Sequence, residues 1–97
     1  MSKKLSGKEF VEELRKGIKK TSLLNKDYFV IVGQLVEDEE VEDTSIVLVK
    51  ENTKKVLCSF SYDTNGLIYN LSFGSISFIE LCELTDTIKS ILDHYNF

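Results

Sequence analysis

Residues 55–73, KVLCSFSYDTNGLIYNLSF, decide the fold that we predict for this chain of 97 residues. Apolar and polar residues alternate on both sides of positions 63–66, and such alternation is typical of half-buried strands. Asn-Gly between two alternating runs favours a tight hairpin, in which a type I′ turn needs positive φ at both central residues. We therefore expect two antiparallel strands, each with one apolar face toward the core: Val56, Cys58, Phe60 and Tyr62, then Leu67, Tyr69, Leu71 and Phe73.

Two further strands are predicted upstream of this hairpin. Residues 28–36, YFVIVGQLV, and residues 45–49, SIVLV, are rich in β-branched and aromatic residues. Both runs are apolar on both alternating faces, a pattern that is typical of central strands covered on two sides.

A helix is predicted at each end of the chain, over residues 7–20 and 77–95. Ser6 with Glu9, and Ser77 with Glu80, have the spacing of capping boxes. Apolar residues then recur at helical spacing in each segment. The first stripe is Phe10, Val11, Leu14 and Ile18, and the second is Leu81, Leu84, Ile88, Ile91, Leu92 and Tyr95.

These elements predict one α+β domain over residues 1–97, a single four-stranded antiparallel meander with a helix at each terminus (α-β-β-β-β-α). Helices of such a domain gather on one face of the sheet. The second apolar face of the two upstream strands then needs a cover, because large bare apolar patches are rare on monomers. We expect a homodimer through that face, or a partner that hides it.

The composition indicates a non-secreted protein that does not span a membrane. The formal net charge is −4, with +5 over residues 1–26 and −9 over residues 27–97. Two cysteines do not make a disulfide framework, and the chain begins without an apolar signal segment. We therefore expect a cytoplasmic location. The absence of alanine and proline, with eleven lysines against one arginine, favours an AT-rich bacterial or phage source.

The sequence offers little catalytic chemistry, and we predict no catalytic residue, no metal and no cofactor. His94 falls on the polar face of the last predicted helix, while Cys58 and Cys82 are expected to be buried as small apolar residues. The glycines do not have the spacing of a phosphate-binding loop. Direct binding of nucleic acid is not expected either, because aromatic residues do not alternate with lysine and arginine.

The run EDEEVED at positions 37–43 is the main clue to function. Six of its seven residues are acidic: Glu37, Asp38, Glu39, Glu40, Glu42 and Asp43. The run could be a solvated hairpin loop that keeps apolar strands apart from other chains. It could bind a cation, although it lacks the glycine of a calcium loop. It could also be a recognition surface for a basic partner.

In size, acidity and layout the chain resembles phage-encoded inhibitors of host nucleases that imitate DNA, and small immunity proteins that block toxin nucleases. The resemblance covers the layout alone. It implies a non-enzymatic inhibitor or adaptor whose six acidic residues at 37–43 bind a basic, nucleic-acid-binding protein surface. The alternative is a phage or mobile-element component that assembles with itself through its apolar sheet face.

Overall fold

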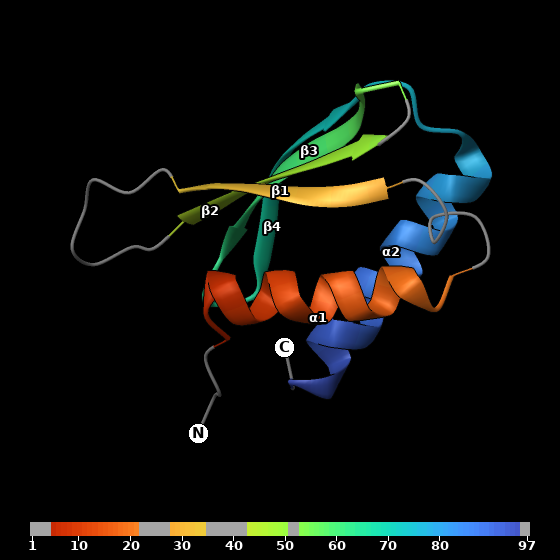
Figure 1. Cartoon of the computed structure of the whole chain (residues 1–97). Coiled ribbons are helices and arrows are strands. Elements are labelled where there is room, and N and C mark those ends of the chain that lie inside the picture. The colour runs from red at the N-terminus through yellow and green to blue at the C-terminus, as the bar shows by residue number, and fades with distance from the viewer. Residues whose placement is uncertain (1–4, 22–27, 35–42, 51–52, 96–97) are drawn as a thin grey trace.

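The computed structural model describes residues 5–21, 28–34, 43–50 and 53–95 (Figure 1). In chain order the elements are α1 (Gly7–Lys19), β1 (Tyr28–Gln34), β2 (Asp43–Lys50), β3 (Lys55–Asp63), β4 (Leu67–Phe73) and α2 (Phe78–His94). The strands form one antiparallel sheet in the order β1-β2-β3-β4. Strands β1 and β4 are therefore the edges of the sheet.

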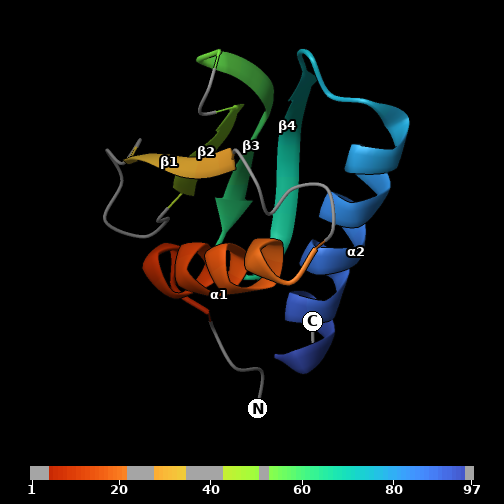
Figure 2. The same cartoon turned by 45° about the vertical axis from the view of Figure 1, so that its right-hand side comes forward.

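Both helices pack on one face of the sheet, which we call the inner face. Helix α1 runs below β1 and β2, and α2 makes its main contact with α1 (Figures 1 and 2). Side chains from both helices and from the inner face form one buried cluster, which includes Phe10, Leu14, Phe60, Leu84 and Ile91. No helix of the described residues is long and apolar enough to cross a membrane.

Both predicted capping boxes are confirmed. The Ser6 hydroxyl accepts a hydrogen bond from the Glu9 amide at 3.1 Å, and the Glu9 carboxylate accepts one from the Ser6 amide. Ser77 and Glu80 do the same at the start of α2. Each box satisfies two amides that a helix N-terminus leaves without an intrahelical partner, and so it fixes where the helix begins.

The β3–β4 hairpin is present, but the predicted type I′ turn is wrong. Asp63 pairs with Leu67, which leaves three loop residues. Among these, Gly66 alone has positive φ, at 90°. The Asp63 carboxylate accepts a hydrogen bond from the Asn65 amide at 3.0 Å, and the Gly66 amide donates to the Asp63 carbonyl. This side-chain contact stabilises an ordinary turn that ends in a left-handed glycine, the common three-residue hairpin.

The predicted apolar face of the last strand is wrong for Leu67 and Tyr69 and right for Leu71 and Phe73, because β4 contains one extra residue. Ser59 pairs with Ser72 and Ser61 with Tyr69, so three steps along β4 match two along β3. Asn70 takes up the difference in the left-handed conformation, with φ 55°. Asparagine tolerates this conformation better than most residues do. The bulge moves the alternation by one residue, so Leu67 and Tyr69 lie on the outer face while Leu71 and Phe73 lie on the inner face.

The predicted architecture is therefore corrected, although the α+β class is confirmed. Where the structure describes side chains as well as backbone, the order of elements is a helix, three antiparallel strands (β2, β3 and β4) and a second helix. Of β1 it describes the backbone and the side chain of Val30, which is buried. The sheet also departs from the regular four-stranded meander that we expected. A second register shift, between Leu48 and Val49 of β2, leaves Leu57 as an extra residue in β3.

Candidate functional site

Most of the predicted acidic site lies outside the described residues. Glu37, Asp38, Glu39, Glu40 and Glu42 belong to the connection between β1 and β2, of which the structure gives only the paired ends, Gln34 and Thr44. Asp43 opens β2, where its backbone pairs with that of Asp63. The role of the acidic run remains a prediction.

The two cysteines differ, so the prediction that both are buried is half wrong. Cys58 is 1% exposed, and burial raises its thiol pKa to about 11. Such a thiol stays protonated and unreactive near neutral pH. Cys82, by contrast, is exposed on α2. The helix stripe continues through Leu84, which is 2% exposed, and leaves Cys82 beside it on the solvent side.

The described residues do not bring a metal-binding group together. Within residues 5–21, 28–34, 43–50 and 53–95, no three of the His, Cys, Asp and Glu side chains are grouped to hold an ion. His94 is exposed near the end of α2, and its ring meets the ring of Tyr95 edge to face at 5.2 Å.

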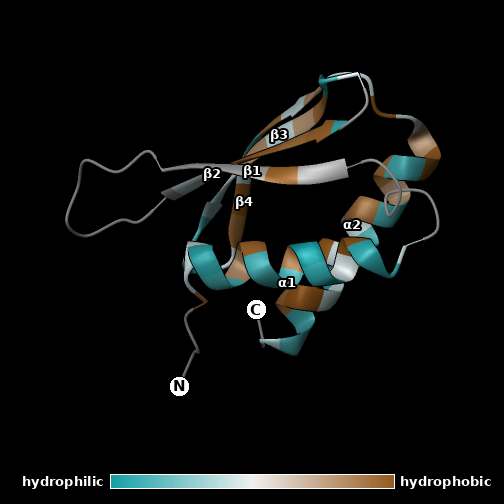
Figure 3. Ribbon diagram, in the orientation of Figure 1, coloured by the Kyte–Doolittle hydropathy of each residue, from teal (hydrophilic) through white to brown (hydrophobic). Residues whose placement is uncertain are grey.

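The most distinctive surface of the described chain is apolar and lies where β4 leads into α2. Phe78 is 77% exposed and Ile79 64%, while Leu71 and Phe73 are each more than half exposed. Val56 is exposed on the neighbouring strand. We call these five residues the apolar corner. Figure 3 shows hydrophobic residues in the first turn of α2, where this strand-to-helix connection ends.

Backbone contacts hold the two sides of the apolar corner together. The Gly74 amide donates to the Leu57 carbonyl at 2.8 Å, and the Ser75 amide donates to the Val56 carbonyl at 3.0 Å. A Cβ on Gly74 would lie 2.3 Å from the Val56 carbonyl oxygen, so glycine is required for this approach. The connection after β4 is thereby fixed beside β3, and α2 begins from a defined position.

The apolar corner is exposed because the helices leave this end of the inner face uncovered. Leu71 and Phe73 lie on the inner face, because Phe73 pairs with the buried Cys58. Helix α2 packs mainly against α1 and does not cover this end of β4. The Ser77 cap starts α2 so that Ile76 packs against the core while Phe78 and Ile79 stay in solvent.

The charge near the apolar corner comes from two sources, because Lys54 and Lys55 precede Val56 while α2 is acidic overall. Helix α2 carries Glu80, Glu83, Asp86 and Asp93 against one lysine, Lys89, a formal net charge of −3 with His94 neutral. An apolar patch that leads into an acidic helix suits a partner with an apolar centre and basic residues on the side that faces the helix.

Sequence reasoning missed the apolar corner, although one signal was present. Ile79 and Cys82 fall outside the helical stripe that runs through Leu84 and Ile91, so they could have been assigned to the solvent side. The exposure of Leu71 and Phe73 had no such signal. Both residues lie on the predicted inner face, and they are exposed because α2 packs against α1 and does not cover this end of β4.

Comparisons with family models, with curated proteins and with solved structures found no match to this chain.

Proposed function

We propose that this chain is a non-enzymatic, protein-binding domain whose apolar corner docks on a partner protein. The observation that supports the proposal is the exposure of Phe78 and Ile79 together with Leu71 and Phe73. Exposed apolar patches of this kind usually mark interaction sites, because leaving them in water costs free energy. Aromatic residues such as Phe73 and Phe78 also dominate the binding energy of interfaces.

The partner is a protein with a basic surface beside an apolar centre. This follows from the charge of −3 on α2 and from the excess of acidic residues over positions 27–97. Complementary charge speeds encounter and selects among partners, whereas buried apolar contacts slow dissociation. An inhibitor or adaptor in the cytoplasm of a bacterium or phage host fits this description, and the acidic run at 37–43 would add to the attraction.

Serine substitutions at the apolar corner test the proposal. Phe78→Ser with Ile79→Ser should leave the melting temperature nearly unchanged, since both side chains are already exposed. A partner isolated with the wild-type chain, then purified, should bind this variant at least about tenfold more weakly, the loss expected for a pair of interface anchors.

The matched control is Leu67→Ser. Leu67 is 56% exposed, but it lies at the other end of β4 and on the outer face. Partner binding should survive this change. Equal binding by the wild type and the Phe78/Ile79 variant would rule out the apolar corner as the docking surface.

Self-association is the second candidate function, and β4 is the observation that favours it. This edge strand, LIYNLSF, contains no charged residue and no proline. Uncharged edge strands pair readily with other strands. Sedimentation of the purified chain separates the two functions, because an assembly protein forms a dimer or larger species without a partner and a partner-dependent domain does not.

A further inference from the structure

Helices α1 and α2 cross closely at Gly17 and Thr87, and the crossing leaves a hollow on each side. A Cβ on Gly17 would lie only 2.4 Å from the Thr87 methyl, so the two helices are about as close as glycine allows. One hollow, of about 320 Å³, reaches from this crossing to the end of α2. It is separate from the apolar corner, which lies at the start of α2.

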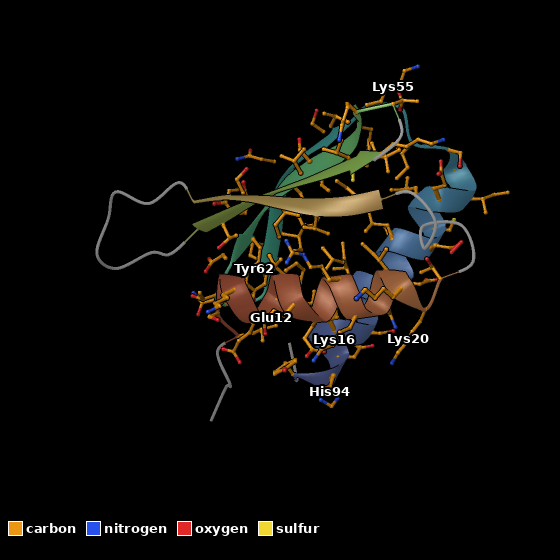
Figure 4. The ribbon with its side chains drawn as sticks, viewed as in Figure 1. Glu12, Lys16, Lys20, Lys55, Tyr62 and His94 are labelled. Carbon is orange, nitrogen blue, oxygen red and sulfur yellow. The ribbon has the colours of Figure 1, made fainter. Side chains whose placement is uncertain are left out.

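The border of this hollow carries three basic side chains. Lys16 lies in the last turn of α1, Lys20 is the residue that caps this helix, and His94 comes from the end of α2 (Figure 4). One carboxylate, Glu13, also lines the hollow and contacts the Lys16 ammonium at 3.6 Å. The formal charge of the lining is therefore +1 with His94 neutral and +2 with His94 protonated, in a chain whose net charge is −4.

The inside of the hollow is not only charged. Ile91 is 7% exposed and belongs to the core cluster, and Tyr95 packs against that cluster. Both line the hollow, together with the Ser90 side chain. A ligand here would meet an apolar floor, a hydroxyl and three basic groups, the mixture that small-molecule sites use to bind and to orient.

The hollow on the other side of the crossing differs in charge. Its volume is about 370 Å³, and it shares Gly17, Lys20, Thr87 and Ser90 with the first. It carries the carboxylates of Glu83 and Asp86, and it lacks both Lys16 and His94. Attraction for an anion is thus confined to one side of the crossing.

We propose that the hollow bordered by Lys16, Lys20 and His94 binds a small organic oxyanion. The anionic head, a phosphate, sulfonate or carboxylate, lies among the three basic side chains, and an apolar group lies over Ile91 and Tyr95. This site is independent of the docking surface proposed above. It would let a small metabolite or a phosphorylated compound bind a domain whose partner binds elsewhere.

Benzenesulfonate is the probe for this site, because its charge does not change between pH 6 and pH 8. Benzenesulfonamide has nearly the same shape without the charge, and sulfate has the head without the ring. In two-dimensional NMR, benzenesulfonate should give saturable shifts at Ile91, His94 and Tyr95, which line this hollow and not the other. The sulfonamide and sulfate should each give much weaker shifts at the same concentrations.

Variants then test the basic residues. Lys16→Gln and His94→Gln should each weaken benzenesulfonate binding several-fold. Lys89→Gln should not, although Lys89 is as exposed as Lys16 and is likewise paired with a carboxylate, that of Asp93 at 3.3 Å. Binding should be tighter at pH 6 than at pH 8 in the wild type and not in the His94 variant. A histidine side chain is the kind of group that can gain a positive charge over this range, and a positive ring attracts the sulfonate.

Two results would overturn the proposal. One is the absence of saturable shifts at these residues with benzenesulfonate at millimolar concentration. The other is equal binding by the wild type and the Lys16 and His94 variants. Either would leave the lysines with the ordinary role of cations at the C-terminal end of α1, where they suit the helix dipole.

Discussion

At the scale of single residues, Tyr62 ties the start of the chain to the sheet. Its side chain is fully buried, its ring stacks on Phe10 with centroids 4.1 Å apart, and its hydroxyl donates to the Leu5 carbonyl at 2.6 Å. Tyr62→Phe would leave that buried carbonyl without this donor, at a cost of about 1–2 kcal/mol of unfolding free energy. Urea denaturation at pH 7 measures the loss, and an unchanged midpoint would contradict it.

The same tyrosine makes stability depend on pH in the alkaline range. Burial, and then the charges of Asp63 and Glu9, raise the Tyr62 pKa from 10 to about 12. The folded state therefore favours the neutral phenol, so this contribution is present below pH 10 and is lost as the pH rises toward 12. Between these values the stability of the wild type should fall more steeply than that of Tyr62→Phe. Parallel curves would contradict the assignment, because Cys58 titrates in both proteins and cancels.

The two thiols should react differently in the native protein. A thiol reagent at pH 8 should label Cys82, which is exposed, and should leave Cys58 unlabelled, because burial raises its pKa to about 11. Mass spectrometry should show one label before denaturation and two after it. Cys82→Ser should abolish native labelling and Cys58→Ser should not. Native labelling of Cys58 would contradict its burial.

At the scale of elements, Gly17 decides how closely α1 and α2 approach. Gly17→Ala would gain about 1 kcal/mol of helix propensity, yet its Cβ would collide with the methyl group of Thr87. Thr87 has little freedom to move aside, since its hydroxyl donates to the Glu83 carbonyl at 2.8 Å. Overpacking of this kind costs about 1–3 kcal/mol, so the variant should be less stable than the wild type.

Thr87→Ser is the matched test, because it removes the colliding methyl and keeps the hydroxyl. In that background Gly17→Ala should become stabilising, by up to about 1 kcal/mol. A thermal double-mutant cycle measures the sign change. If Gly17→Ala has the same effect in the wild type and in the Thr87→Ser background, the contact between positions 17 and 87 does not set the helix separation.

Local sequence signals predicted the elements better than they predicted the faces. Two capping boxes placed the helices within a residue or two, because each box involves contacts only three residues apart. The bulge at Asn70 could not be predicted in this way, since it depends on how β4 pairs with β3. One added residue reverses the faces on either side of it, and this moved Leu67 and Tyr69 from the predicted inner face to the outer face.

At the scale of the whole molecule, the sequence indicated the uneven charge but not the apolar corner. Charge can be counted along the chain, and the basic start with the acidic remainder is evident from the residues alone. Predicting the apolar corner requires knowing that α2 packs against α1 rather than over the end of β4. That choice depends on the Gly17 crossing, a tertiary contact with no sequence motif.

The acidic run and the apolar corner should act on different steps of partner binding. Charges act over distance and chiefly change the association rate, whereas buried apolar contacts chiefly change the dissociation rate. Replacing Glu39, Glu40, Glu42 and Asp43 with their amides should slow association by about tenfold or more at low salt and reduce its dependence on salt. Phe78→Ser should instead speed dissociation and leave the salt dependence as it is.

Surface plasmon resonance between 0.05 and 0.5 M salt, with the purified partner, separates these effects. The amide variant and the wild type should converge at high salt, because the Debye length falls from about 14 Å to about 4 Å over this range. The Phe78 variant should remain weaker at every salt concentration. If the amide variant associates as fast as the wild type at low salt, the run at 37–43 is a solvated loop, and recognition of the partner falls to the apolar corner and the acidic surface of α2.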